Sequence, residues 1–315
     1  MIEDFYPQKP ELVDKKRQNN LLMTIGSIVL FVLLFMVFFT EELNFILSLV
    51  VVLLVHELGH FLLMKNYNYK HVRMLFVPFM GAFVQGEKEE YSQKESLLVS
   101  VAGPFPGIVI GIILVLFSAS YESNYVLEFG LLFFILNFIN LLPLDPLDGA
   151  SILKLLFKIN QEMFSLVFTF ASSLAMILVG WFISSWLMIG FGFLMGFRVK
   201  SIQSNMQLRK LLREENVEYQ TSYRKLSNRD YSIIKNILLD KIPNLRTVID
   251  SIDESEGEQL MASQVNNTLE SPLKYDASLA LKVAILLYWV AVLALPIAAY
   301  IYFDLLIVYY DWFKI

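Results

Sequence analysis

The sequence has no cysteine, only three histidines and few charged residues. Without cysteine it can form neither a disulfide bond nor a thiolate-ligated metal site. Charged residues make up 17% of the 315 positions, and the net charge of −5 comes from acids and bases mixed along the chain. A nucleic-acid-binding surface needs a block of basic residues, so we expect no nucleic-acid partner.

Apolar residues dominate instead. They account for 56% of the chain, and the mean hydropathy is +0.56. Soluble proteins seldom have this composition, so we expect the chain to lie in a lipid bilayer. A membrane-spanning helix needs about 20 apolar residues. We therefore predict an all-α polytopic membrane protein with about seven transmembrane helices, near residues 21–40, 45–64, 97–118, 126–142, 163–183, 186–197 and 279–303.

Composition and charge also predict the domain organisation. We expect a short N-terminal segment (1–20), a transmembrane core (21–200), a small helical cytoplasmic domain (201–276), and a last transmembrane helix with its tail (279–315). Lys15, Lys16 and Arg17 precede the first apolar run and no small-residue cleavage site follows it, so we interpret that run as a retained span. Basic residues favour the cytoplasmic side, which places the N-terminus there.

Residues 69–96 are too polar and too interrupted by Pro78 and Gly81 to cross a membrane. Val72, Met74 and Phe76 alternate with their neighbours, which is the pattern of a half-buried strand. We predict extended strands within residues 69–96, with an ordinary surface loop as the alternative.

The most informative stretch is His56-Glu57-Leu58-Gly59-His60, inside the second apolar run. On a helix, residues four apart share a face, so His56 and His60 can offer two imidazoles to one ion. Glu57 beside them can take a proton from a zinc-activated water. Ionisable groups within a membrane segment are costly and usually mark a functional site.

A second polar stretch ends the fourth apolar run, from Asn137 to Gly149. Pro143 and Pro146 cannot continue a helix, so the chain should unwind there and expose Asp145 and Asp148. A carboxylate at this point can complete a zinc site of two histidines with one position open to water. Asp-Gly alone would be an ordinary turn.

These two stretches resemble the site-2 proteases, a family of intramembrane zinc metalloproteases with His-Glu-x-x-His in one core helix and Leu-Asp-Gly at the end of another. The resemblance covers roughly residues 21–158. It implies that His56, His60 and Asp148 bind Zn²⁺, that Glu57 is the general base, and that Asn140 helps to bind substrate. It also likens Pro78-Phe79-Met80-Gly81 to the family's membrane-associated hairpin, and Ala102-Gly103-Pro104 to the start of its middle core helix.

The resemblance further implies regulated intramembrane proteolysis: hydrolysis of peptide bonds within transmembrane segments of other membrane proteins, after an upstream site-1-type protease has acted. It implies a multi-pass location in a prokaryotic cell membrane. Two departures stand out. Gly107 occupies a position where many members have asparagine, and Asp145 is an additional acid that could bind metal in place of Asp148.

Two other functions are compatible with the sequence. The first is a non-catalytic membrane scaffold or sensor that retains the protease fold. The second is a transporter, whose polar groups would line a path across the bilayer, whereas here they gather near one side. The intact Glu57 favours the protease.

Overall fold

The computed structural model describes residues 6–13, 20–38, 43–77, 81–121, 123–157, 161–242 and 244–313. Several positions used in the predictions lie outside the described residues: Lys15 to Arg17, Glu41, Glu42, Pro78 to Met80, and Lys158. The described residues form two compact units. The site unit draws on 19–87, 93–159 and 275–315, and the helical-domain unit on 1–18, 88–92 and 160–274.

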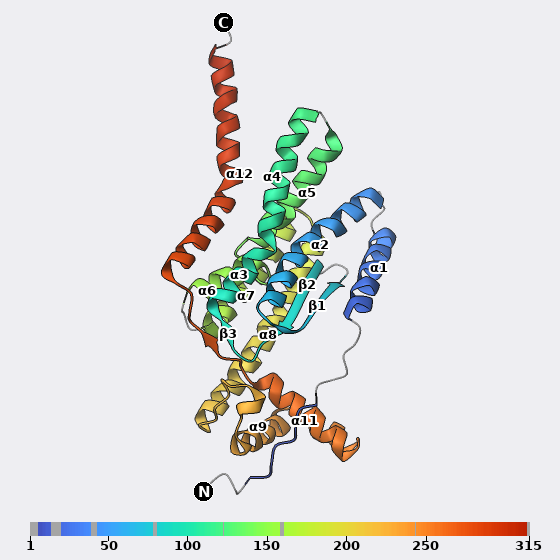
Figure 1. The fold of residues 1–315 in the computed structure, drawn as a ribbon, viewed down its shortest axis with the longest axis vertical. Helices are drawn as coiled ribbons and strands as arrows, with labels where there is room; N and C mark the ends of the chain where they lie inside the picture. The colour runs from blue at the N-terminus through green and yellow to red at the C-terminus, as the bar shows by residue number, and fades with distance from the viewer. Residues whose placement is uncertain are drawn as a thin grey trace. The chain divides into compact units, whose positions relative to one another are not determined.

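The site unit is built from helices and one β-hairpin (Figure 1). Its elements are α1 (Asn20–Phe38), α2 (Leu43–Asn66), β1 (Lys70–Val77), β2 (Gly81–Glu87), α3 (Gln93–Ala102), α4 (Pro104–Tyr121), α5 (Asn124–Asn140), α6 (Asp148–Leu156) and α12 (Leu279–Phe313). Helices α4 and α5 pack as a hairpin, as Figure 1 shows in green. Strand β1 packs on α1, and β2 packs on α2.

The predicted β-hairpin is present but shorter than residues 69–96. Strands β1 and β2 pair antiparallel from Lys70 to Glu87, and Val72, Met74 and Phe76 are buried as their alternation predicts. The prediction was wrong for Gln93 to Ser96, which form the first turn of α3. Gln, Lys and Glu are good helix formers, and the Gln93 side chain donates from Nε2 to the Leu155 carbonyl of α6 at 2.6 Å.

The helical-domain unit contains a helix pair and a smaller bundle. Its elements are β3 (Tyr91–Ser92), α7 (Gln161–Phe182), α8 (Trp186–Glu214), the 3₁₀ turn η2 (Tyr223–Lys225), α9 (Asn228–Lys241), α10 (Leu245–Asp250), α11 (Glu254–Thr268) and β4 (Leu273–Lys274). The bundle, which we call the helical domain (residues 217–274), has an apolar core with Ile234, Met261 and Val265 at its centre, and Leu212 of α8 packs into this core. Helix α8 runs without a break past Arg198 and Lys200, so the boundary expected at 201 falls inside a helix.

Four helical stretches within the described residues are long and apolar enough to cross a membrane: 43–66, 93–118, 162–182 and 279–298. Leu21–Val37 and Asn124–Asn140 are apolar but shorter. These helices support a membrane protein, while the predicted count of seven spans is not confirmed.

Candidate metal centre

Helix α2 carries both histidines on one face. The helical spacing brings the Nε2 atoms of His56 and His60 to 3.2 Å from each other. His56, Glu57 and His60 are 4%, 5% and 8% exposed, so the polar face of α2 is turned into the protein. The sequence motif is therefore assembled by one helix.

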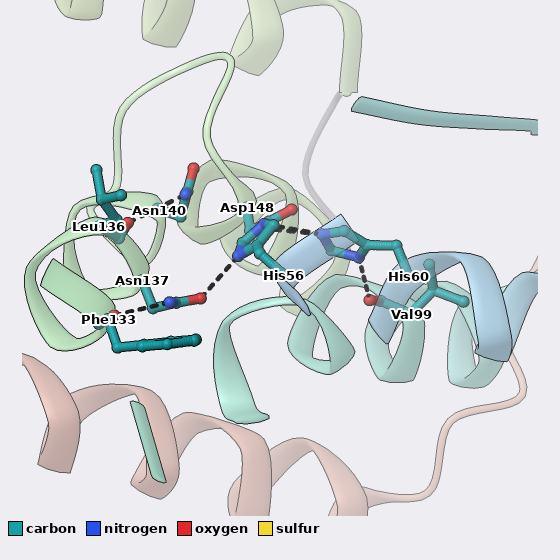
Figure 2. Close-up of polar contacts among 8 residues, drawn as sticks. All are labelled: His56, His60, Val99, Phe133, Leu136, Asn137, Asn140 and Asp148. Carbon is teal, nitrogen blue, oxygen red and sulfur yellow. Dashed lines mark hydrogen bonds and ion pairs between the residues drawn. The ribbon is translucent and has the colours of Figure 1, made fainter. Parts of the chain in front are cut away.

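The third group comes from the other polar stretch. Helix α5 ends at Asn140, and α6 begins with Asp148 as its first residue. The Asp148 Oδ2 atom lies 3.1 Å from Nε2 of His56 and 3.3 Å from Nε2 of His60 (Figure 2). Among the residues that the structure describes, these three side chains form a group able to hold a metal ion.

The other nitrogen of each imidazole is engaged by an acceptor. His60 Nδ1 lies 2.7 Å from the Val99 carbonyl, which can only accept, so this nitrogen carries the proton. His56 Nδ1 lies 2.8 Å from Oδ1 of Asn137, whose Nδ2 donates to the Phe133 carbonyl at 2.7 Å. That second bond fixes the orientation of the Asn137 amide, so the His56 Nδ1 also donates (Figure 2).

When the rings are neutral, each Nε2 atom is therefore unprotonated and carries a lone pair. Both Nε2 atoms face a carboxylate oxygen of Asp148. Asp148 Oδ2 has no hydrogen-bond partner among the described residues, although both nitrogens lie close to it. Three electron-rich atoms this close repel one another unless a cation lies between them. Tetrahedral zinc, with bonds of about 2.0–2.1 Å, separates its ligand atoms by about 3.3–3.4 Å. The observed distances of 3.1–3.3 Å fit zinc.

Glu57 adds a buried carboxylate to this group. Its Oε2 atom is buried and has no hydrogen-bond partner among the described residues. A buried carboxylate oxygen without a partner is costly, so its presence calls for a role in binding or proton transfer.

Two glycines make room for the metal-binding side chains. A Cβ atom on Gly103 would collide with the His60 ring, and one on Gly107 would collide with the Asn137 amide. Gly107, the position that departs from the family pattern, thus gives Asn137 the space to reach His56. The glycine at this departure from the family pattern thus has a steric role.

Asp145, the alternative ligand, has another partner. It is 3% exposed, and its Oδ1 accepts from the Lys154 ammonium at 2.8 Å. The pair ties the loop between α5 and α6 to the last turn of α6. The structure therefore groups Asp148, and not Asp145, with the histidines.

A further contact holds this loop from helix α12. The buried indole of Trp289 donates from Nε1 to the Leu141 carbonyl at 2.7 Å, where α5 ends. The same carbonyl lies against Gly149, next to Asp148, because a Cβ there would collide with it. The sequence indicated no role for Trp289, since a tryptophan in an apolar run is common.

Asn140 does not reach the histidines. Its Nδ2 donates to the Leu136 carbonyl at 3.1 Å within α5, and its role in substrate binding stays a prediction (Figure 2). Asn137, which sequence reasoning passed over, is 0% exposed and contacts His56. An asparagine within an apolar helix was the signal that could have identified it.

Strand β2 has an open edge near this group. On β1, the Met74 carbonyl accepts from Thr24 and the Phe76 N–H donates to Ser27, so both point toward α1. Their cross-strand partners are Val84 and Ala82. In such non-hydrogen-bonded pairs, the N–H and C=O groups of β2 point to the opposite edge. Among the described residues β2 pairs only with β1, and the Val84 backbone hydrogen-bonds to Glu57.

Comparison with known proteins agrees with the chemistry of this group. Residues 44–128 match the model of peptidase family M50. A zinc metalloprotease of Methanocaldococcus jannaschii is 35% identical over 115 residues, and the stage IV sporulation protein FB of Bacillus subtilis is 30% identical over 126 residues. These alignments take in 35% and 38% of this chain, and 33% and 42% of the two relatives. The chain thus matches less than half the length of either.

A solved structure, a site-2 protease from Methanocaldococcus jannaschii, aligns with a TM-score of 0.44 and 22% identity, over 56% of this chain and 87% of that one. The matched family segment contains His56, Glu57 and His60, while Asp148 lies beyond it. The expected resemblance to zinc metalloproteases is confirmed by the match of residues 44–128 to peptidase family M50 and by the relative from Methanocaldococcus jannaschii.

Proposed function

We propose that this protein is an intramembrane zinc metalloprotease that hydrolyses peptide bonds within transmembrane segments of other membrane proteins. One observation carries the proposal. Three electron-rich ligand atoms converge beside a buried carboxylate, and the two histidines and that carboxylate lie on α2, a helix long and apolar enough to cross a membrane. Water-activating zinc sites combine three protein ligands with an open position and a neighbouring base.

The residues then have distinct roles. His56, His60 and Asp148 hold zinc, and Asn137 with the Val99 carbonyl orients the two imidazoles. Bound zinc supplies Lewis acidity, which polarises the scissile carbonyl and makes water a better nucleophile. Glu57 takes the proton of the attacking water and later delivers it to the leaving amine, for which its unpartnered Oε2 is available.

The open edge of β2 suits the substrate. A transmembrane helix hides its peptide bonds, so the segment to be cut must first become extended. Ala82 directs its backbone groups away from β1, and an extended segment can add to that edge at Ala82, beside the Val84 backbone that hydrogen-bonds to Glu57. In regulated intramembrane proteolysis the substrate would first be shortened by a site-1-type protease, which we propose as the upstream partner.

The alternative, a non-catalytic scaffold or sensor, has less support. Such a protein could keep the metal ligands for stability. It would gain nothing from an acid at Glu57 whose buried oxygen has no partner among the described residues, because an apolar side chain would be more stable there.

Metal content and cleavage test the proposal together. We expect purified wild-type protein to hold about one zinc per chain by mass spectrometry, and His56→Ala and Asp148→Ala to lose it. Asp145→Asn is the matched control and should keep the metal, because Asp145 pairs with Lys154. Glu57→Gln should keep zinc. Cleavage is measured on a panel of reporter proteins that have one membrane span and a tag at each end, and Glu57→Gln should cut none of those that wild type cuts.

The two functions give different outcomes. Zinc in wild type and Glu57→Gln, with cleavage in wild type alone, supports the protease. Zinc in wild type and in Glu57→Gln, with no difference between them in the cleavage of any reporter protein, would support the scaffold. Wild type that is well folded but free of zinc, purified without chelators, would contradict the protease and favour the scaffold.

A further inference from the structure

An extended segment near the N-terminus lies against the helical domain. Residues 7–13 have no regular secondary structure, and the side chains of Glu11, Leu12 and Val13 are exposed. No residue of this segment belongs to the apolar core of the helical domain. The segment is thus seated on the domain surface, in the way a bound peptide would be.

Side chains of the domain hydrogen-bond to the backbone of the segment. The Lys9 N–H donates to Oδ1 of Asn228 at 3.1 Å, and the Pro10 carbonyl accepts from the Tyr223 hydroxyl at 2.8 Å. Gln259 contacts two further groups: it donates to the Glu11 carbonyl at 2.8 Å and accepts from the Val13 N–H at 3.1 Å. Contacts to backbone groups recognise an extended chain whatever its side chains are.

Lys9 is the residue of the segment whose side chain the helical domain recognises. Its ammonium donates to the carbonyls of Tyr223 (2.7 Å), Arg224 (3.1 Å) and Leu226 (2.5 Å), which the 3₁₀ turn η2 presents together. It also lies 5.3 Å from the centre of the Tyr223 ring. A lysine ammonium has three donors on one atom, which match three converging acceptors, whereas a planar guanidinium spreads its donors over a fork.

The lysine site works without a carboxylate. No ion pair of Lys9 is found among the described residues, so three backbone carbonyls and the Tyr223 ring stabilise its charge. Burial lowers the pKa of Lys9, and the amino group keeps its three acceptors. The following Pro10 keeps the backbone extended and brings its carbonyl to Tyr223.

We propose that the helical domain carries a peptide-binding site for an extended Lys-Pro segment, and that residues 6–13 of this chain fill it. The site recognises one lysine side chain through η2 and four backbone groups through Tyr223, Asn228 and Gln259. A polypeptide that presents the same Lys-Pro pattern competes with residues 6–13 for this site. The proposal is independent of the zinc group.

Peptide binding to the full chain in detergent tests the proposal. The probe is a fluorescent synthetic peptide with the sequence of residues 6–13, followed by anisotropy. We expect saturable binding to a variant that lacks residues 1–13, and binding at least about ten-fold weaker to the intact chain, whose site is filled. A peptide with methionine in place of the lysine should bind at least about ten-fold more weakly, because it loses three charge-assisted hydrogen bonds.

The matched control is a peptide with glutamine in place of Glu11, which should bind unchanged because Glu11 contributes only its carbonyl. If removal of 1–13 impairs folding, the intact Lys9→Met chain replaces it and should bind more probe than the intact Glu11→Gln chain. Equal binding of the lysine and methionine peptides would overturn the proposal. So would a folded variant, shortened or Lys9→Met, that takes up no more probe than wild type.

Discussion

Individual side chains set the chemistry of the metal group, and most of them were visible in the sequence. The spacing of four residues between His56 and His60 is enough to predict that they share a helix face. The choice between Asp145 and Asp148 could not be made from the residues alone, because it depends on where Lys154 lies. Asn137 was missed because its role depends on the absence of a side chain at Gly107, on another helix.

Asn137 provides the sharpest test of the ligand geometry. Asn137→Ala removes the acceptor of the His56 Nδ1 proton, so the ring loses its fixed tautomer and orientation. We expect zinc affinity to fall by about 10–100-fold, measured by competition with a chromogenic chelator. Asn140→Ala, one turn further along α5, is the control and should leave zinc affinity unchanged. Equal losses in the two variants would show that α5 packing, not this hydrogen bond, governs metal binding.

The sequence predicted the type of each secondary-structure element better than the residues at which the element begins and ends. The alternation of apolar and polar residues in β1 predicted a strand, and the residues expected to be buried, Val72, Met74 and Phe76, are buried. The end of the hairpin was misplaced because Gln93 to Ser96 are polar enough to suggest a loop, and only their contact with α6 shows that they begin a helix. The edge on which β2 is open follows from hydrogen bonds made by Thr24 and Ser27, which sequence cannot reveal.

A proline on β2 tests the use of that edge. Ala82→Pro removes one outward N–H and leaves the pairing with β1 intact, because the N–H of Ala82 points away from β1. We expect zinc content to stay at the wild-type value and cleavage of reporter proteins to fall at least about ten-fold. Ala82→Ser keeps the N–H and should cut as wild type does. Full activity of the proline variant would exclude this edge as the substrate site.

For the molecule as a whole, the contact between residues 6–13 and the helical domain constrains the membrane topology. Two segments that touch must lie on the same side of the membrane, so the chain between them crosses it an even number of times. Within the described residues of that stretch, five apolar helical segments precede α8: α1, α2, α3 with α4, α5 and α7. A sixth crossing by the first part of α8, residues 186–197, satisfies this condition and agrees with the sequence prediction.

Labelling of single cysteines tests directly whether the two segments lie on the same side of the membrane. The natural sequence has no cysteine that would interfere. We introduce cysteine at Glu11, at Glu256 in α11, and at the exposed Phe182, the last residue of α7. A membrane-impermeant maleimide should reach the first two from the same side, which we expect to be the cytoplasm, and Phe182→Cys from the opposite side. Labelling of Glu11→Cys and Glu256→Cys from opposite sides would rule out the docked segment.

The same contact also sets an order in time. The Tyr223 acceptor of Lys9 is synthesised 214 residues after Lys9 itself. The apolar helices of the metal group are synthesised in between, so the two partners can meet only after those helices have been inserted. Docking of residues 6–13 therefore follows the insertion of these helices and depends on their having crossed the membrane in the correct order.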